Sequence, residues 1–140
     1  MKKTVNVVLL AIRYPAMLEG IRGLLETMFG SVAMVSDERS LLETLGKLDP
    51  DLVVVDLSFH VVRESNVAIL LNRYDTKLKF IVLSTYEERE IMENCMSSGA
   101  SGYVLKRSAG RDLGEAVEEV LKGDTFASPC ISLAKENIKQ

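Results

Sequence analysis

Short runs of consecutive apolar residues alternate along this chain with longer stretches in which apolar residues recur at every third or fourth position. An unbroken apolar run is typical of a strand covered on both faces, and the wider spacing is typical of an amphipathic helix. Their regular alternation indicates repeated βα units around a parallel sheet. Five such units are expected between Met1 and Gly123.

The predicted strands and helices follow directly from this pattern. The strands are expected at residues 5–11, 32–35, 52–55, 80–83 and 102–105. Each is followed by a helix whose apolar face lies within residues 17–28, 41–48, 67–74, 91–96 and 113–121. Ser36 or Asp37 is predicted to cap the second helix, and Gly99 to end the fourth.

The chain of 140 residues has the length of one domain. We expect that domain to span residues 1–124. Residues 125–140 are predicted to form a linker or a C-terminal helix, because Ser128-Pro129 resembles a helix start and the apolar residues after it are too few for a core of their own.

The net charge of the chain limits the classes of partner that it is expected to bind. Seventeen Lys and Arg against twenty Asp and Glu give a net charge of −3, which argues against a basic nucleic-acid-binding domain. No apolar run approaches the ~20 residues that span a bilayer, so a cytoplasmic protein without membrane contact is expected. Two cysteines, Cys95 and Cys130, and a single histidine exclude a zinc site of ordinary spacing.

Three polar residues stand where consecutive strands end. Asp56 follows the third predicted strand, Ser84 the fourth and Lys106 the fifth. Ligands of open parallel sheets bind outside the carboxyl ends of the strands, so these side chains are expected to converge. A carboxylate, a hydroxyl and an ammonium group together can accept a phosphoryl group on the carboxylate and hold its oxygens.

At these residues the chain resembles the receiver domain of bacterial two-component response regulators, in the branch with a LuxR-type helix-turn-helix output domain. The resemblance covers about residues 5–129 through "VVLLAIRYPAMLEGIRGLLE", "PDLVVVDLS", "IVLST", "SGASGYVLK" and "GDTFASP". It implies a flavodoxin-like (βα)5 doubly wound sheet in the order 2-1-3-4-5. It also implies that Asp56 is the phospho-acceptor, Ser84 the hydroxyl near the phosphoryl group, Lys106 the basic contact and Tyr103 an aromatic switch residue.

The resemblance further implies partners. A sensor histidine kinase or another signalling protein is expected to bind, and a homodimer is possible in this family. DNA would be contacted only through an output domain that this chain does not contain. The expected function is therefore phosphorelay signal transduction that controls transcription, with no enzymatic activity of its own.

The chain departs from the family after the first strand. Two acidic residues usually hold Mg²⁺ there, and this chain has Ile12 and Arg13, which leaves Asp56 as the only remaining carboxylate ligand. A hard cation needs several oxygen ligands, so weak or absent Mg²⁺ binding, no other cofactor and impaired phosphorylation of Asp56 are expected. Arg13 either pairs with Asp56 in place of the metal or points to solvent. His60 is expected to be a solvated loop residue.

Two other classes of function are compatible with a protein of this size. A nucleotide-binding enzyme or a hydrolase is excluded because neither a glycine-rich phosphate loop nor a G-x-S-x-G motif occurs. The alternative that stays open is a phosphorylation-independent interaction module. In that case the chain keeps the receiver fold for its binding surface while the pocket around Asp56 is vestigial.

Overall fold

The sheet of this protein has six parallel strands, in the order β2-β1-β3-β4-β5-β6. The structure is a computed structural model and describes residues 6–14, 18–129 and 131. The strands are β1 (Val7–Ala11), β2 (Ser31–Val35), β3 (Leu52–Asp56), β4 (Phe80–Ser84), β5 (Gly102–Leu105) and β6 (Phe126–Ala127). The predicted flavodoxin-like doubly wound order is confirmed for the first five strands.

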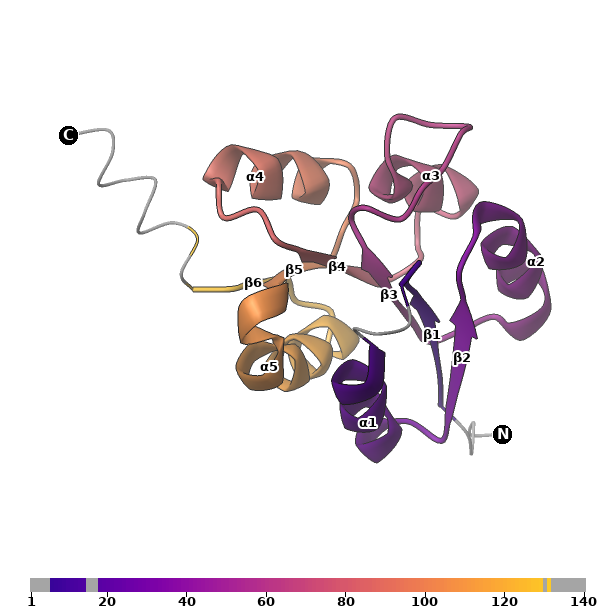
Figure 1. Cartoon of the computed structure of the whole chain (residues 1–140), viewed down its shortest axis with the longest axis horizontal. Helices are drawn as coiled ribbons and strands as arrows, with labels where there is room; N and C mark the ends of the chain where they lie inside the picture. The colour runs from indigo at the N-terminus through magenta and orange to yellow at the C-terminus, as the bar shows by residue number, and fades with distance from the viewer. Residues whose placement is uncertain (1–5, 15–17, 130, 132–140) are drawn as a thin grey trace.

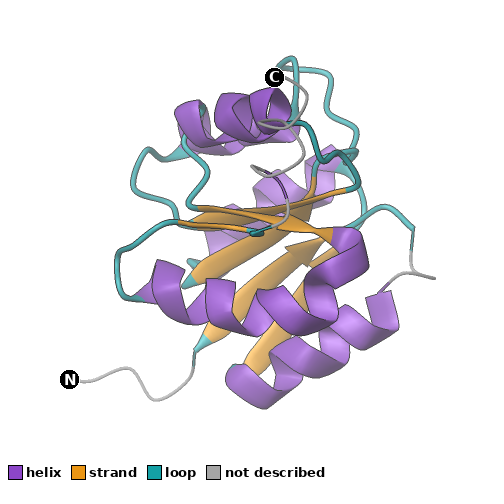
Figure 2. Ribbon diagram, turned by 90° about the vertical axis from the view of Figure 1, so that its left-hand side faces the viewer, coloured by secondary structure: helices purple, strands orange, loops and turns teal. Residues whose placement is uncertain are grey.

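Helices cover both faces of the sheet. They are α1 (Leu18–Met28), α2 (Glu38–Leu48), α3 (Val67–Tyr74), α4 (Arg89–Ser97) and α5 (Ala109–Leu121), and a short 3-10 turn, η2 (Lys106–Ser108), precedes α5. Figure 1 shows α2, α3 and α4 on one side of the sheet and α1 and α5 on the other. The turned view in Figure 2 shows the strands enclosed between these two helical layers.

Each face of the sheet has its own hydrophobic core. One core joins alternate residues of the strands to α2, α3 and α4, and the other joins the remaining strand residues to α1 and α5. Every residue of β3 and β4 is buried, Asp56 and Ser84 included. The unbroken apolar runs of these strands therefore reflect burial on both sides.

The predicted apolar faces extend one residue too far in three helices. Leu48, Tyr74 and Leu121 were assigned to the inner faces of their helices but are 42%, 45% and 40% exposed. Each is the last residue of its helix. The apolar spacing therefore continues to the last residue of each helix, where the side chain is only partly covered.

The predicted ends of α2 and α4 are confirmed. The Asp37 carboxylate caps α2 by accepting the N–H of Ser40 at 2.8 Å. The backbone at the end of α4 turns at Gly99, with φ +109°, while the Gly99 N–H donates to the Met96 carbonyl and the Ala100 N–H to the Cys95 carbonyl. This pair of bonds is a Schellman motif.

The C-terminal segment holds a strand that the pattern missed. Two residues, Phe126 and Ala127, pair with Gly102 and Tyr103 of β5, and a strand this short leaves no periodic signal. The boundary at residue 124 stays a prediction, although the sheet continues past it. Of the helix predicted after Ser128-Pro129, only Ile131 lies within the described residues. In the described part of the chain, no helix combines the length and the apolar character that a membrane span requires.

The conformation of Gly99 generates a prediction. A Cβ on this residue would meet the side chain of Asn72, and its positive φ is unfavourable for any L residue. We expect Gly99→Ala to lower the free energy of unfolding by about 1–3 kcal/mol in urea denaturation. Gly20→Ala, in the exposed part of α1 with no atom near its Cβ, is the matched control and should be neutral or slightly stabilising. Equal effects of the two substitutions would contradict the role of Gly99.

Candidate functional site

The three residues predicted to converge do so at the carboxyl edge of the sheet. Asp56 ends β3, Ser84 ends β4, and Lys106 follows β5. The Lys106 ammonium lies 2.6 Å from Asp56 Oδ2, with side chains 14% and 4% exposed. Together with Ser58 and Tyr86 they line a small pocket of about 150 Å³. The geometry therefore brings a carboxylate, a hydroxyl and a cation into one cavity.

The second carboxylate oxygen of Asp56 is held by Ser58, which the sequence reasoning did not single out. Asp56 Oδ1 accepts the backbone N–H of Ser58 at 2.9 Å and its hydroxyl at 2.8 Å. An aspartate bonded to the backbone two residues later is a common turn device, and this local signal was present in the sequence. Both oxygens of Asp56 thus have protein donors, and the negative charge is compensated within the chain.

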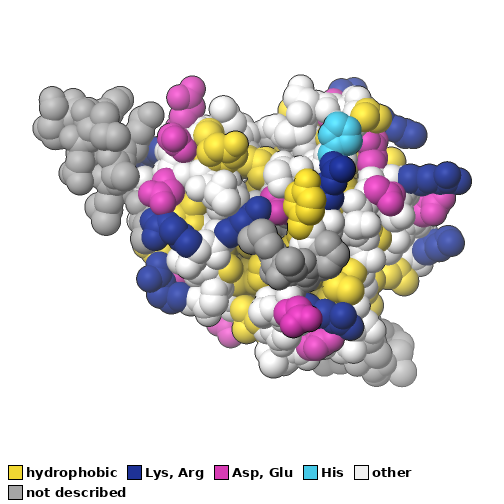
Figure 3. Space-filling model, viewed as in Figure 1, with side chains coloured by type: hydrophobic (Ala, Val, Ile, Leu, Met, Phe, Trp, Pro, Cys, Tyr) yellow, Lys and Arg dark blue, Asp and Glu magenta, His cyan; other side chains and the backbone are white. Residues whose placement is uncertain are grey.

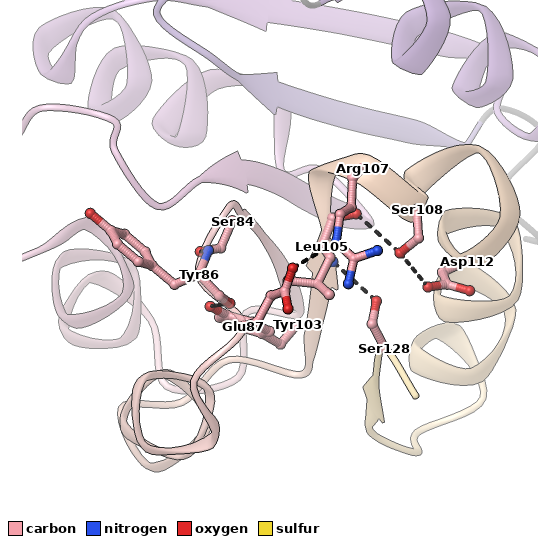
Figure 4. Close-up of polar contacts among 9 residues, drawn as sticks. All are labelled: Ser84, Tyr86, Glu87, Tyr103, Leu105, Arg107, Ser108, Asp112 and Ser128. Carbon is pink, nitrogen blue, oxygen red and sulfur yellow. Dashed lines mark hydrogen bonds and ion pairs between the residues drawn. The ribbon is translucent and has the colours of Figure 1, made fainter. Parts of the chain in front are cut away.

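Ser84 and Tyr103 both form hydrogen bonds with the backbone of Tyr86, in the loop after β4. The Ser84 hydroxyl accepts the N–H of Tyr86 at 3.0 Å, and the hydroxyl of Tyr103 donates to the Tyr86 carbonyl at 2.8 Å (Figure 4). Tyr103 is fully buried. Burial raises the pKa of its phenol, and a hydrogen bond with Ser84 opposes that rise. Tyr103, the predicted switch residue, is therefore neutral. Its buried hydroxyl holds the loop after β4 in place by donating to the Tyr86 carbonyl.

The two residues at the expected metal position, Ile12 and Arg13, are not among the residues that line this pocket. Ile12 is 3% exposed and belongs to the core shared with α1 and α5. Arg13 is exposed, and its guanidinium carbon lies 5.7 Å from the centre of the Tyr14 ring. Of the two interpretations of Arg13, the inward pair with Asp56 is wrong in this structure, because Lys106 occupies that role.

Arg13 instead lines a second pocket. This pocket has a volume of about 320 Å³ and is lined by Arg13, Asp37, Glu38 and His60, among others. His60 is exposed, as expected for a loop histidine. Among the described residues no group of three or more His, Cys, Asp or Glu side chains could hold a metal ion.

Charges of both signs are mixed over the face of the molecule that Figure 3 shows. The charged residues of the described chain include exposed ion pairs between neighbouring helical turns, such as Arg22 with Glu26 and Arg39 with Glu43. Exposed pairs of this kind contribute little stability. A surface with interspersed charge differs from the basic stripe that nucleic-acid-binding domains present.

Comparison with known proteins gives consistent results. A family model for the response regulator receiver domain matches residues 8–118. The transcriptional regulatory protein DegU of Brevibacillus brevis is 30% identical over 117 residues, which are 81% of this chain and 49% of DegU. The chain therefore spans about half the length of this relative.

Solved structures agree with the family match. A structure of the RcsB response regulator of Salmonella typhimurium superimposes with a TM-score of 0.84 at 27% identity, over 96% of this chain and 68% of that one. Another, of two RcsB dimers bound to two parallel DNAs, gives a TM-score of 0.82 at 27% identity, over 94% of this chain and 68% of that one.

The contacts of Asp56 predict which basic residue is coupled to it. In a double-mutant cycle, Lys106→Met and Asp56→Asn should show a coupling of about 1–3 kcal/mol in the free energy of unfolding, because either substitution alone leaves a buried charge without its partner. The matched cycle, Arg13→Ala with Asp56→Asn, should be additive within about 0.3–0.5 kcal/mol. A larger coupling for Arg13 than for Lys106 would contradict this geometry.

Proposed function

Because the chain belongs to the response regulator receiver domain family, with relatives such as DegU and RcsB, we propose that it is an atypical receiver of phosphorelay signalling with impaired phosphorylation of Asp56. In this proposal Asp56 is the phospho-acceptor, Ser84 and Lys106 hold the phosphoryl oxygens, and Tyr103 is the switch residue. The observation that carries the proposal is the pairing of Asp56 with Lys106 at 2.6 Å while Ile12 and Arg13 stand at the metal position.

The residues at this edge do not fit a Mg²⁺ ion. The ion requires near-octahedral oxygen ligands and keeps several waters. Ile12 supplies an alkyl group that is packed in the core, and Arg13 supplies a positive charge that repels a cation. The remaining carboxylate, Asp56, already accepts bonds from Ser58 and Lys106. Phosphoryl transfer to Asp56 would therefore depend on the protein's own groups.

Without the metal, the chain's own groups have limited means to assist the reaction. Transfer of a phosphoryl group to Asp56 brings more negative charge into a pocket where Lys106 is the nearby cation. Such reactions depend on electrostatic compensation of the developing charge. One ammonium group that already neutralises Asp56 gives less compensation than a divalent ion would, so slow phosphorylation is expected.

The partners follow from the family at the level of proposal. We expect a sensor histidine kinase or another signalling protein to contact the loops around Asp56. The relative RcsB is described as dimers bound to DNA. By analogy, this receiver would act on transcription as a signalling module and not as an enzyme, and a homodimer is consistent with that role.

A phosphorylation-independent interaction module is the second candidate. It is favoured by the same ion pair, because Lys106 and Ser58 satisfy Asp56 without any phosphoryl group. The pocket would then maintain one conformation of the receiver surface permanently. The two candidates differ in whether Asp56 is ever modified, which the following measurements decide.

Metal binding provides the first test of the proposal. Isothermal titration calorimetry with millimolar Mg²⁺ should give no saturable heat, because the position lacks the oxygen ligands that a hard cation needs. Arg13→Asp should increase any binding by adding a carboxylate and removing a positive charge. Saturable uptake by the unmodified chain that disappears in Asp56→Asn would show that a metal site exists after all.

Phosphorylation provides the second test. During incubation with acetyl phosphate and Mg²⁺, transfer of the phosphoryl group to Asp56 would release acetate and raise the intact mass by one phosphoryl group. We expect the unmodified chain to stay mostly unlabelled and the Ile12→Asp plus Arg13→Asp variant to gain an adduct that Asp56→Asn abolishes.

Ile12 is buried, so a charge at that position threatens the fold. Arg13→Asp alone is therefore measured in parallel, and circular dichroism verifies that each variant is folded. Rapid stoichiometric labelling of the unmodified chain would exclude impaired phosphorylation and favour a conventional receiver.

A further inference from the structure

The last described part of the chain returns to the sheet directly beside the strand that leads to Lys106. β6 pairs with β5, and the N–H of Ser128 then donates to the Tyr103 carbonyl at 2.9 Å. Ile131, only 1% exposed, lies in the same hydrophobic cluster as Tyr103. Within the segment 126–131, the described residues are thus held by backbone pairing with β5 and by the apolar packing of Ile131.

A buried polar cluster reinforces this attachment. Ser108, Asp112 and Ser128 are 7%, 4% and 2% exposed. The Ser128 hydroxyl accepts the N–H of Leu105 at 3.0 Å, and the Ser108 hydroxyl donates to Asp112 Oδ2 at 2.7 Å (Figure 4). We call these three side chains the β5–α5 clamp. They come from η2, α5 and the segment after β6, so the clamp joins three parts of the chain at one point.

The charge of Asp112 holds the clamp together. Burial alone would favour the protonated carboxyl, but hydrogen bonds from Arg111, Ser108 and Ser128 outweigh it and lower the pKa of Asp112. The Arg111 Nε lies 3.0 Å from Asp112 Oδ1. A hydroxyl can donate one hydrogen bond and accept another. Ser128 therefore links an anionic carboxylate to the backbone N–H of Leu105.

Lys106 lies in the sequence between Leu105 and Ser108, the two residues that these hydrogen bonds hold in place. The clamp holds Leu105 through its N–H and Ser108 through its hydroxyl. The Lys106 ammonium reaches Asp56 from this short, doubly fixed stretch. A shift at either fixed position displaces the base of the Lys106 side chain.

We propose that Ser128, Asp112 and Ser108 position Lys106 on Asp56 and thereby connect this ion pair to the segment 126–131, through which the chain leaves the sheet. The link acts in both directions, because a coupling free energy between two sites is reciprocal. Release of the segment loosens the ion pair, and loss of the ion pair loosens the segment. The inference does not depend on whether Asp56 is phosphorylated.

The first arm of the test measures Lys106 in the whole chain, without phosphoryl donor or Mg²⁺. Its amine is labelled with a limiting amount of an acylating reagent and quantified by peptide mass spectrometry. Ser128→Ala should increase labelling of Lys106 about threefold or more, because an unpaired buried N–H favours local opening. The exposed Lys122 is the internal reference and should not change.

Ser101→Ala is the matched control for this arm. Ser101 precedes β5, and its backbone, like that of Ser128, bonds to the neighbouring strands, but it lies outside the clamp. Asp112→Asn is the second clamp variant and should act in the same direction as Ser128→Ala. If Lys106 is labelled no more in Ser128→Ala and Asp112→Asn than in Ser101→Ala, the proposal is wrong, even if the two clamp variants are less stable.

The second arm measures the reverse direction by hydrogen–deuterium exchange. Asp56→Asn should increase the exchange rate of peptides covering 126–131 by about threefold or more, whereas Glu118→Gln, an exposed substitution on α5, should leave it unchanged. Unchanged exchange in Asp56→Asn would show that the segment and the ion pair are independent. Neither arm involves phosphorylation, so failure here is distinct from failure of the proposed function.

Discussion

The buried charge of Asp56 constrains the whole carboxyl edge of the sheet. An ionised carboxylate that is 3% exposed is tolerable only with a cation and hydrogen-bond donors in place. Lys106 supplies the cation from beyond β5, across the end of β4, and Ser58 supplies two donors from the adjacent turn. The turn after β3, the end of β4 and the start of η2 are therefore positioned around a single anion.

The edge that carries Asp56 and the core meet at Ile12. Its apolar side chain packs into the core with α1 and α5. In the proposed function, the residue expected to weaken metal binding therefore also contributes to packing. Membership of the receiver family and the likeness to solved receiver structures account for the fold, whereas the local contacts of Asp56 and Ile12 bear on the proposed reaction.

Much of this architecture could be predicted from the sequence, because burial on both faces and helical amphipathicity leave strong periodic signals. The convergence of Asp56, Ser84 and Lys106 followed from their positions at strand ends alone. The exposure of Arg13 could not be predicted, since it depends on a choice between a pair with Asp56 and contact with solvent. Nor could the hydrogen bond that the Ser128 hydroxyl accepts from the N–H of Leu105, because the two residues are 23 positions apart in the sequence.

The two edges of the sheet differ in their protection. β6 covers part of β5, while among the described residues β2 pairs only with β1. An edge strand presents unpaired backbone groups that can template the addition of another strand. β2 is apolar over residues 32–35, and its Met34 side chain is 42% exposed. Intermolecular strand pairing should therefore begin at the β2 edge and not at the opposite edge, which β5 and β6 form. Aggregation at high concentration would start at the same edge.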